Sequence, residues 1–171
     1  MPDYSLNNWI LDASLSGGAI LDLHVHDVDY GVYLLGRPAA VTAQATQRVP
    51  GSFDRVEALW HYGNGQLVNI EGYWDMPAGF GFNMGITARF EKAALTFDLG
   101  KPLTIYQEGK EPETPKMPEP ADGYFAEIAY FLDCIERNAT PSLSTPAQSR
   151  DAVMIALAEK QSAITGRTVT L

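Results

Sequence analysis

The sequence predicts an α+β protein with an open, mainly antiparallel β-sheet and helices packed on one face. Three observations lead to this fold class: a long amphipathic helix comes first, several segments with strand-like alternation follow, and two helices close the chain. Short turns join the strand segments, whereas parallel strands need crossovers of a dozen residues or more. We therefore expect an antiparallel meander.

The first helix is predicted over residues 18–35. Apolar residues recur there with the spacing of one buried helical stripe, at Leu21, Val25, Val28, Val32 and Leu35. A polar stripe lies one residue later, at Asp22, His26, Asp29 and Tyr33. Gly36 and Pro38 then form a stop signal.

The alternative for the same residues is a strand, and the choice decides which side chains act together. A strand would place Asp22, His24 and His26 on one face, as metal ligands are placed. A helix makes Asp22 and His26 an i,i+4 pair and turns His24 elsewhere. The stripe favours the helix, so we predict an acid–imidazole pair near its N-terminal end.

Six later segments alternate between apolar and polar residues, and we predict strands at 40–48, 55–62, 66–74, 82–90, 94–98 and 103–106. A glycine-rich hairpin turn at 63–65 joins the second strand to the third. A proline-rich, charged stretch at 107–121 is typical of a surface linker.

Two helices are predicted near residues 122–138 and 146–166, and residues 168–171 predict a last short strand. The apolar stripe of the first is Tyr124, Ile128, Phe131 and Ile135. The second opens with a capping box at Thr145–Gln148 that has a proline at the first helical position. Its apolar residues include Val153, Ala156, Leu157 and Ile164.

Composition places the chain among ordinary globular proteins of one domain, with 171 residues of which 46% are hydrophobic and 19% charged. The net charge of −9 argues against nucleic acid or an anionic membrane as the main partner. No apolar stretch has the length of a membrane span, and residues 1–15 lack the features of a signal peptide. The lone Cys134 excludes an internal disulfide. We expect a cytoplasmic protein.

Sequence signals for a bound cofactor or metal are absent from this chain. The glycine-rich stretch at 79–85 has the wrong spacing for a dinucleotide loop and precedes a predicted strand rather than a helix. There is no Walker sequence and no cysteine-based metal spacing. We therefore predict no cofactor-binding residue and no metal ligand within these 171 residues.

A set of residues spread over nearly the whole chain occurs in the order of a known family. In the first part these are Trp9, Gly17, Gly18, Asp22, His26, Asp27, Asp29, Leu34, Leu35, Gly36 and Pro38. In the last part they are Tyr124, Glu127, Phe131, Pro141, Ala152, Ser162, Ala163, Thr165, Gly166, Arg167 and Val169. With them the chain resembles the C-terminal domain of the Gfo/Idh/MocA oxidoreductases, which include glucose–fructose oxidoreductase and inositol dehydrogenase.

The resemblance implies a single domain over residues 1–171 for substrate binding and oligomerisation, with the fold of dihydrodipicolinate-reductase-like or glyceraldehyde-3-phosphate-dehydrogenase-like C-terminal domains. It implies a Rossmann domain, absent from this chain, that holds NAD or NADP and contributes a lysine. The implied partners are that domain, a sugar or polyol substrate, and further copies of the chain through the sheet face. The chain alone is expected to be inactive, as a fragment, a split subunit or a degenerate module.

The resemblance also assigns the candidate site residues. Asp22 and His26 match the catalytic carboxylate and imidazole: His26 would take the proton of a substrate hydroxyl, and Asp22 would orient the ring. Trp9, Gly18 and His24 are the predicted substrate-binding residues. His24 stands where many relatives have a small residue.

Two other functions stay open from the sequence. One is a non-catalytic dimerisation or ligand-binding module. The other is a metal-dependent hydrolase that uses His24 and His26 with an aspartate, and it requires a strand at these residues.

Overall fold

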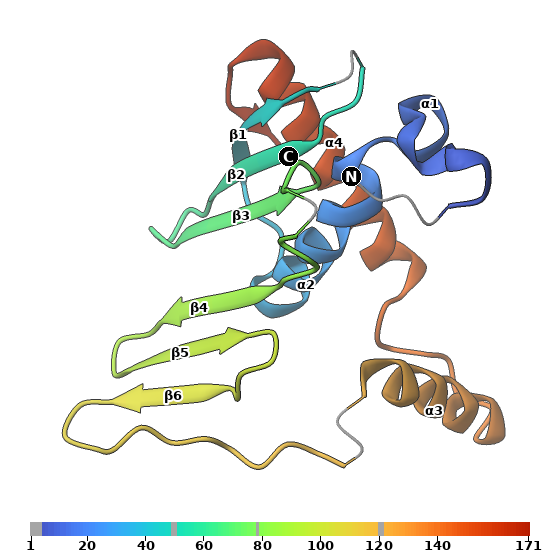
Figure 1. The fold of residues 1–171 in the computed structure, drawn as a ribbon. Coiled ribbons are helices and arrows are strands. Elements are labelled where there is room, and N and C mark those ends of the chain that lie inside the picture. Colours follow the sequence, from blue (N-terminus) through green and yellow to red (C-terminus); the bar gives the residue numbers. More distant parts are fainter. Residues whose placement is uncertain (1–4, 49–50, 78, 120–121) are drawn as a thin grey trace. The chain divides into compact units, whose positions relative to one another are not determined.

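The computed structural model describes residues 5–48, 51–77, 79–119 and 122–171. The chain divides into two compact units, one formed by Met1–Ala78 with Ser142–Leu171 and the other by Gly79–Pro141 (Figure 1). All predicted site residues belong to the first unit.

The first unit is built on a four-stranded antiparallel sheet of order β3-β2-β1-β7. Its strands are β1 (Ala40–Thr46), β2 (Arg55–His61), β3 (Leu67–Tyr73) and β7 (Val169–Thr170). The predicted hairpin between β2 and β3 is confirmed, and the Gly65 N–H donates to the Tyr62 carbonyl across its turn. Every second residue of β2 is fully buried, namely Val56, Ala58 and Trp60. One face of the sheet therefore faces the core.

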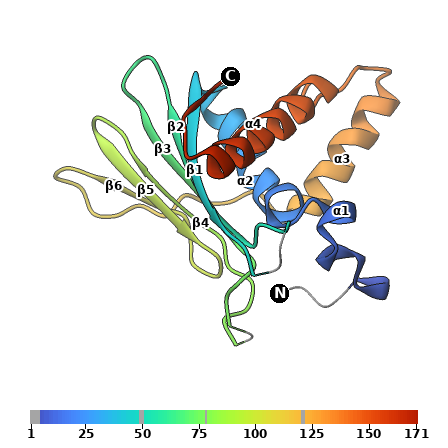
Figure 2. The same ribbon diagram turned by 90° about the horizontal axis from the view of Figure 1, so that it is seen from above.

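Helices cover that face of the sheet. The helical elements of this unit are η1 (Leu6–Leu11), α1 (Ala13–Ser16), η2 (Ile20–His24), α2 (Val25–Leu35) and α4 (Pro146–Thr165). Figure 2 shows α4 running along one side of the sheet of β1–β3, and α4 also packs on α2. The helix predicted over residues 18–35 is confirmed as η2 and α2, and the strand alternative is wrong. The structure adds that η2 is a π-helical turn.

The buried faces of these helices differ from the predicted stripes. In η2 and α2 the buried residues are Ile20, His24, Val28 and Gly31. Leu21, Val25 and Val32 are only partly buried, and Leu35 is exposed. In α4 the buried residues are Ala152, Ile155, Ala156, Glu159 and Ser162, whereas the apolar Val153, Leu157 and Ile164 are exposed.

Close packing on the sheet explains why small residues occupy these faces. A Cβ at Gly31 would lie 2.9 Å from Ile70 Cδ1 and 3.0 Å from the Trp60 ring. On α4, the Ser162 hydroxyl accepts from the Ala43 N–H at 2.9 Å and donates to the Arg167 carbonyl at 2.7 Å. Hydropathy alone does not indicate a helix face made of glycine, alanine, serine and paired polar groups.

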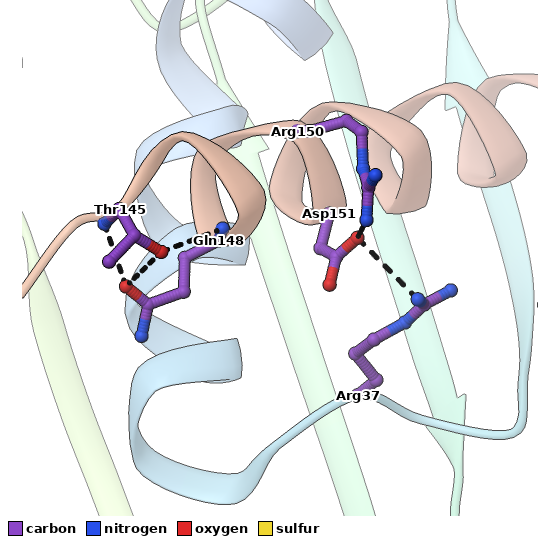
Figure 3. A network of polar contacts seen from close by, with 5 residues as sticks. All are labelled: Arg37, Thr145, Gln148, Arg150 and Asp151. Atoms are coloured by element: carbon purple, nitrogen blue, oxygen red, sulfur yellow. Dashed lines mark hydrogen bonds and ion pairs between the residues drawn. The ribbon is translucent and has the colours of Figure 1, made fainter. Parts of the chain in front are cut away.

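The N-terminus of α4 carries the predicted capping box. The Thr145 Oγ1 accepts from the Gln148 N–H at 3.3 Å, and the Gln148 Oε1 accepts from the Thr145 N–H at 2.8 Å (Figure 3). The helix ends at Gly166 in the left-handed conformation, as the sequence predicts.

Thr145→Ala is expected to lower the free energy of unfolding by about 1 kcal/mol, within the range of about 0.5–2 for lost caps. The reason is that the Gln148 N–H loses its acceptor at the helix start. Chemical denaturation measures the change. Ser149→Ala, at an exposed position of the same turn, is the matched control and should change stability little. Equal losses in both variants would contradict the cap's role.

The second unit contains a three-stranded antiparallel sheet of order β4-β5-β6 and the helix α3 (Gly123–Glu136). Its strands are β4 (Gly85–Arg89), β5 (Ala93–Asp98) and β6 (Thr104–Gln107). β4 begins three residues later than predicted, and the proline-rich stretch pairs once with β6 through Glu113 and Ile105. The α+β class with antiparallel strands is confirmed, with two open sheets.

In α3, Cys134 is buried, as expected for an apolar helix position. The predicted apolar stripe is exposed by more than half at each of Tyr124, Ile128, Phe131 and Ile135. Across the described ranges, no helix is both long and apolar enough to span a membrane.

Candidate functional site

The candidate site begins at the glycine pair before η2. Gly17 ends α1 in the left-handed conformation, and Gly18 follows with φ +73°. A Cβ at Gly18 would lie 3.2 Å from the Ser52 hydroxyl and 3.3 Å from the Phe53 carbonyl. The Gly18 N–H donates to the Ser16 hydroxyl and the Ala19 N–H to the Phe53 carbonyl. Gly18 is therefore required by a contact within the chain itself.

Asp22 and His26 follow on the same helix, Asp22 inside the π-helical turn and His26 near the start of α2. Asp22 is partly buried and His26 is exposed. Within the described residues neither side chain has a hydrogen-bond or ion-pair partner. Both are therefore available to an added molecule.

A groove of about 390 Å³ runs beside α2. Residues of α2, of the segment before α4 and of the first turn of α4 line it, namely His26, Asp29, Tyr30, Val32, Tyr33, Leu143, Ser144 and Gln148. The rings of Tyr30 and Tyr33 stack with centroids 6.3 Å apart. Of the predicted polar stripe, the groove brings together His26, Asp29 and Tyr33, whereas Asp22 is not among its lining residues. Its volume is that of a pocket for a small organic ligand.

His24 lies in the core, on a different side of the helix. Its side chain is 0% exposed, and Nε2 lies 2.7 Å from the Glu159 Oε2. The Trp60 Nε1–H donates to the other oxygen, Glu159 Oε1, at 2.6 Å. A direct substrate contact by His24, as the sequence predicts, would require its ring to leave this buried pair.

Sequence reasoning missed Glu159 and Trp60 as members of this cluster. Glu159 falls at helical spacing from Ala152 and Ile155 on the buried face of α4, so the period of the small residues was the available signal. From the sequence alone, a glutamate in that series is expected to be exposed to solvent unless its buried partner is known. The partner lies 135 residues earlier in the chain.

Trp9, the remaining predicted substrate residue, lies in η1 and is 44% exposed. The neighbouring Ile10 is buried in a small cluster with Ala19 and Trp74, and Leu23 packs against it. This cluster ties η1 to the start of the first helix.

Next to His26, crowding by protein atoms raises the pKa of the Asp27 carboxyl, although the residue as a whole is exposed. Desolvation is the largest cause, and the charges of His24 and His26 act in the opposite direction, lowering the pKa. A carboxyl with a raised pKa in the folded state binds its proton more tightly there than in the unfolded chain.

Asp27→Asn is therefore expected to stabilise the protein at neutral pH. The favourable contribution of Asp27 is present below its unfolded pKa of about 3.8 and is lost as the pH rises through the higher folded value. The variant should be most stable relative to the wild type above the folded pKa of Asp27. Below the unfolded pKa this difference in stability should disappear. Denaturation curves across pH 3–8 measure this, and a variant curve parallel to the wild type would contradict it.

The metal-dependent hydrolase finds no support in this geometry. The helix separates His24, buried in the core, from the exposed His26, whereas a metal site needs both on one face. Among the residues that the structure describes, no group of three or more histidine, cysteine, aspartate or glutamate side chains is placed to hold a metal ion.

Comparison with known proteins gives a family match. A sequence model described as the GFO/IDH/MocA C-terminal domain matches residues 1–96. No curated protein sequence matches the chain.

Several solved structures share the fold. Levoglucosan dehydrogenase, solved with NADH and levoglucosan, is 18% identical over 97% of this chain and 54% of its own, with a TM-score of 0.82. UDP-N-acetylglucosamine 3-dehydrogenase from Acidithiobacillus ferrooxidans is 24% identical over 90% of this chain and 50% of its own, with a TM-score of 0.76. Aldose-aldose oxidoreductase from Caulobacter crescentus, solved with glycerol, is 20% identical over 100% of this chain and 52% of its own, with a TM-score of 0.79. This chain thus spans about half the length of the structures it matches.

Proposed function

Given that this chain belongs to the GFO/IDH/MocA family and matches its C-terminal domain, we propose that it forms the substrate-binding and oligomerisation half of an NAD(P)-dependent oxidoreductase. The proposed reaction transfers hydride between the nicotinamide and a sugar or polyol hydroxyl. The observation that carries the proposal is the helix of η2 and α2, which places His26 at an open groove and Asp22 one turn earlier. Within the described part of the chain, neither side chain has a hydrogen-bond partner.

In this proposal His26 is the general base. Its exposed imidazole accepts the proton of the substrate hydroxyl that is being oxidised, and returns it in the reverse direction. Asp22, one turn earlier on the helix, orients the ring and stabilises its charged form. Both roles need side chains that are not already engaged within the protein, and these two meet that condition.

The groove supplies a place for the sugar. The rings of Tyr30 and Tyr33 offer apolar surface, while Asp29, Ser144 and Gln148 offer hydrogen-bonding groups for hydroxyls. A few polar groups within a mostly apolar wall are typical of small-ligand pockets. Trp9, Gly18 and His24 stay predictions as substrate contacts.

The dinucleotide would be held by a Rossmann domain outside this chain. At the start of η2 the Gly18 and Ala19 N–H groups are already bound to Ser16 and Phe53, so this helix start does not cradle a phosphate. When bound in the complete enzyme, NAD(P)⁺ supplies the hydride acceptor. The residues of this chain bind and orient the sugar and move the proton.

The proposed contact between copies of the chain lies on the sheet face opposite the helices. Leu59 of the central strand β2 is 39% exposed there. Around it, Arg55 lies 4.7 Å from the Tyr73 ring centroid, and the Tyr73 hydroxyl donates to Glu71 at 2.6 Å. Light scattering should show an oligomer for the wild type and a smaller species for Leu59→Glu.

The test of the proposed function is a turnover assay on the complete protein encoded by the reading frame. We expect NAD⁺- or NADP⁺-dependent oxidation of at least one member of a panel of sugars and polyols, followed by nicotinamide absorbance. The chain of 171 residues alone should be inactive but should bind the same sugar weakly. A complete protein without a nucleotide-binding domain, or without turnover of any panel member, would contradict the proposal.

A further inference from the structure

We infer that His24 and Glu159 are positioning residues, whose buried pair holds the π-helical turn η2 and so fixes where Asp22 and His26 lie. The inference rests on the proposed function, because a position matters for catalysis only if those two side chains meet the substrate. Its structural basis is independent of that function.

Glu159 contacts two other buried side chains, one with each carboxylate oxygen. One carboxylate oxygen lies at hydrogen-bond distance, 2.7 Å, from His24 Nε2, and the other accepts from the Trp60 Nε1–H at 2.6 Å. Glu159 comes from α4, Trp60 from β2 and His24 is the last residue of η2. A single carboxylate therefore ties the π-helical turn to both the helix and the sheet beneath it.

Gly72 of β3 lies close to His24. A Cβ at Gly72 of β3 would lie 3.1 Å from the His24 Cβ and 3.2 Å from its Nδ1. The nearest backbone atom, the His24 Cα, would be 3.5 Å away. His24 thus lies between Glu159 of α4 and Gly72 of β3, where a larger residue than glycine would crowd its ring.

The π-helical turn η2 sets the register of the helix that carries Asp22 and His26. A π-helical turn contains an extra residue compared with an α-helical turn, and such turns are rare and frequent at functional sites. Asp22 lies inside the turn, whereas His26 lies beyond it in α2. Conversion of η2 to α-helix would therefore rotate Asp22 relative to His26 by roughly the 100° that one residue subtends.

Stability alone does not explain the buried pair of His24 and Glu159. Buried ionic pairs are often no better than apolar residues of similar volume, because desolvation offsets the attraction. His24 Nδ1 is, among the described residues, the one buried side-chain polar atom without a hydrogen-bond partner. The protein thus tolerates an imperfectly paired imidazole at the centre of a core helix face. A role in fixing geometry accounts for this.

The test compares the double variant His24→Leu/Glu159→Leu with the wild type and with Asp151→Asn. Asp151 is the matched control, since it is an acidic residue of α4 whose partners, Arg37 and Arg150, lie at the surface (Figure 3). A crystal structure of this chain should show η2 of the double variant as regular α-helix with Asp22 displaced from its place relative to His26. In the complete enzyme, kcat should fall by about 10–100-fold with KM nearly unchanged. The control should match the wild type in both measurements.

The inference is overturned if the double variant folds, keeps the π-helical turn and leaves Asp22 and His26 in place, or if it turns over at the wild-type rate. Should the double variant not fold, Glu159→Gln keeps the length of the side chain and is read by the same two measurements. Failure of the proposed function would be recognised by a different result, because the wild-type complete protein would then oxidise no sugar. In that case the crystal structures alone decide whether the pair sets the register.

Discussion

His26→Ala is expected to lower kcat of the proposed complete oxidoreductase by about 10²–10⁴-fold, the range found for the loss of a general base. The exposed imidazole at the groove is the group proposed to take the hydroxyl proton. Without it, water must accept that proton at the moment hydride leaves. KM should change far less, because the remaining groove residues still bind the sugar.

His61→Ala is the matched control for this prediction. His61 lies at the end of β2, where its Nε2 is 2.8 Å from the Thr42 hydroxyl, and it is not among the groove residues. Steady-state kinetics on the two variants should therefore differ by orders of magnitude. A His26→Ala enzyme with the wild-type kcat would show that another group moves the proton.

Glu159→Leu is expected to cost about 3–5 kcal/mol of stability, since removal of one partner leaves the other buried and uncompensated. His24 would keep both ring nitrogens without a partner, and the Trp60 N–H would lose its acceptor. Against a domain stability of about 5–15 kcal/mol this is a large loss for a single side chain. Urea or guanidinium denaturation measures it.

The double variant His24→Leu/Glu159→Leu should be more stable than Glu159→Leu alone. The double variant no longer contains the buried His24 imidazole that would lack a partner. It leaves one unsatisfied group, the Trp60 N–H, which costs about 1–3 kcal/mol of stability. The two single losses should therefore not add. Additive losses would mean that His24 and Glu159 contribute independently and would contradict the pairing.

The sequence was sufficient for the elements because their signals are local. Hydrophobic spacing and the Gly36 stop predicted the first helix, and the capping box at Thr145–Gln148 predicted where α4 begins. Alternation predicted the β2–β3 hairpin. Local signals were less sufficient for β4, whose first predicted residues lie outside the strand.

The buried faces were harder to predict, because they depend on contacts between distant residues. His24 breaks the apolar stripe yet lies at the centre of the buried face, since Glu159 satisfies it from α4. Glycine is normally unfavourable inside a helix, but a Cβ at Gly31 would collide with the side chains of Ile70 and Trp60. The division of the strands into two sheets likewise depends on pairing that no single segment encodes.

The candidate catalytic pair came from motif resemblance combined with helical spacing, and the structure adds its surroundings. The groove contains His26 with Asp29 and two tyrosines, which the polar stripe of α2 indicated in part. Its other wall, Leu143 to Gln148, comes from the far end of the sequence and had no signal linking it to α2.

The measurement that tests the central claim most directly is a crystal structure of the complete oxidoreductase with reduced cofactor and a sugar substrate. We expect the oxygen of the reacting hydroxyl within about 2.6–3.2 Å of a His26 ring nitrogen, with the Asp22 carboxylate close enough to bond to the ring or the sugar. A sugar bound elsewhere, with both side chains facing away from it, would contradict the account.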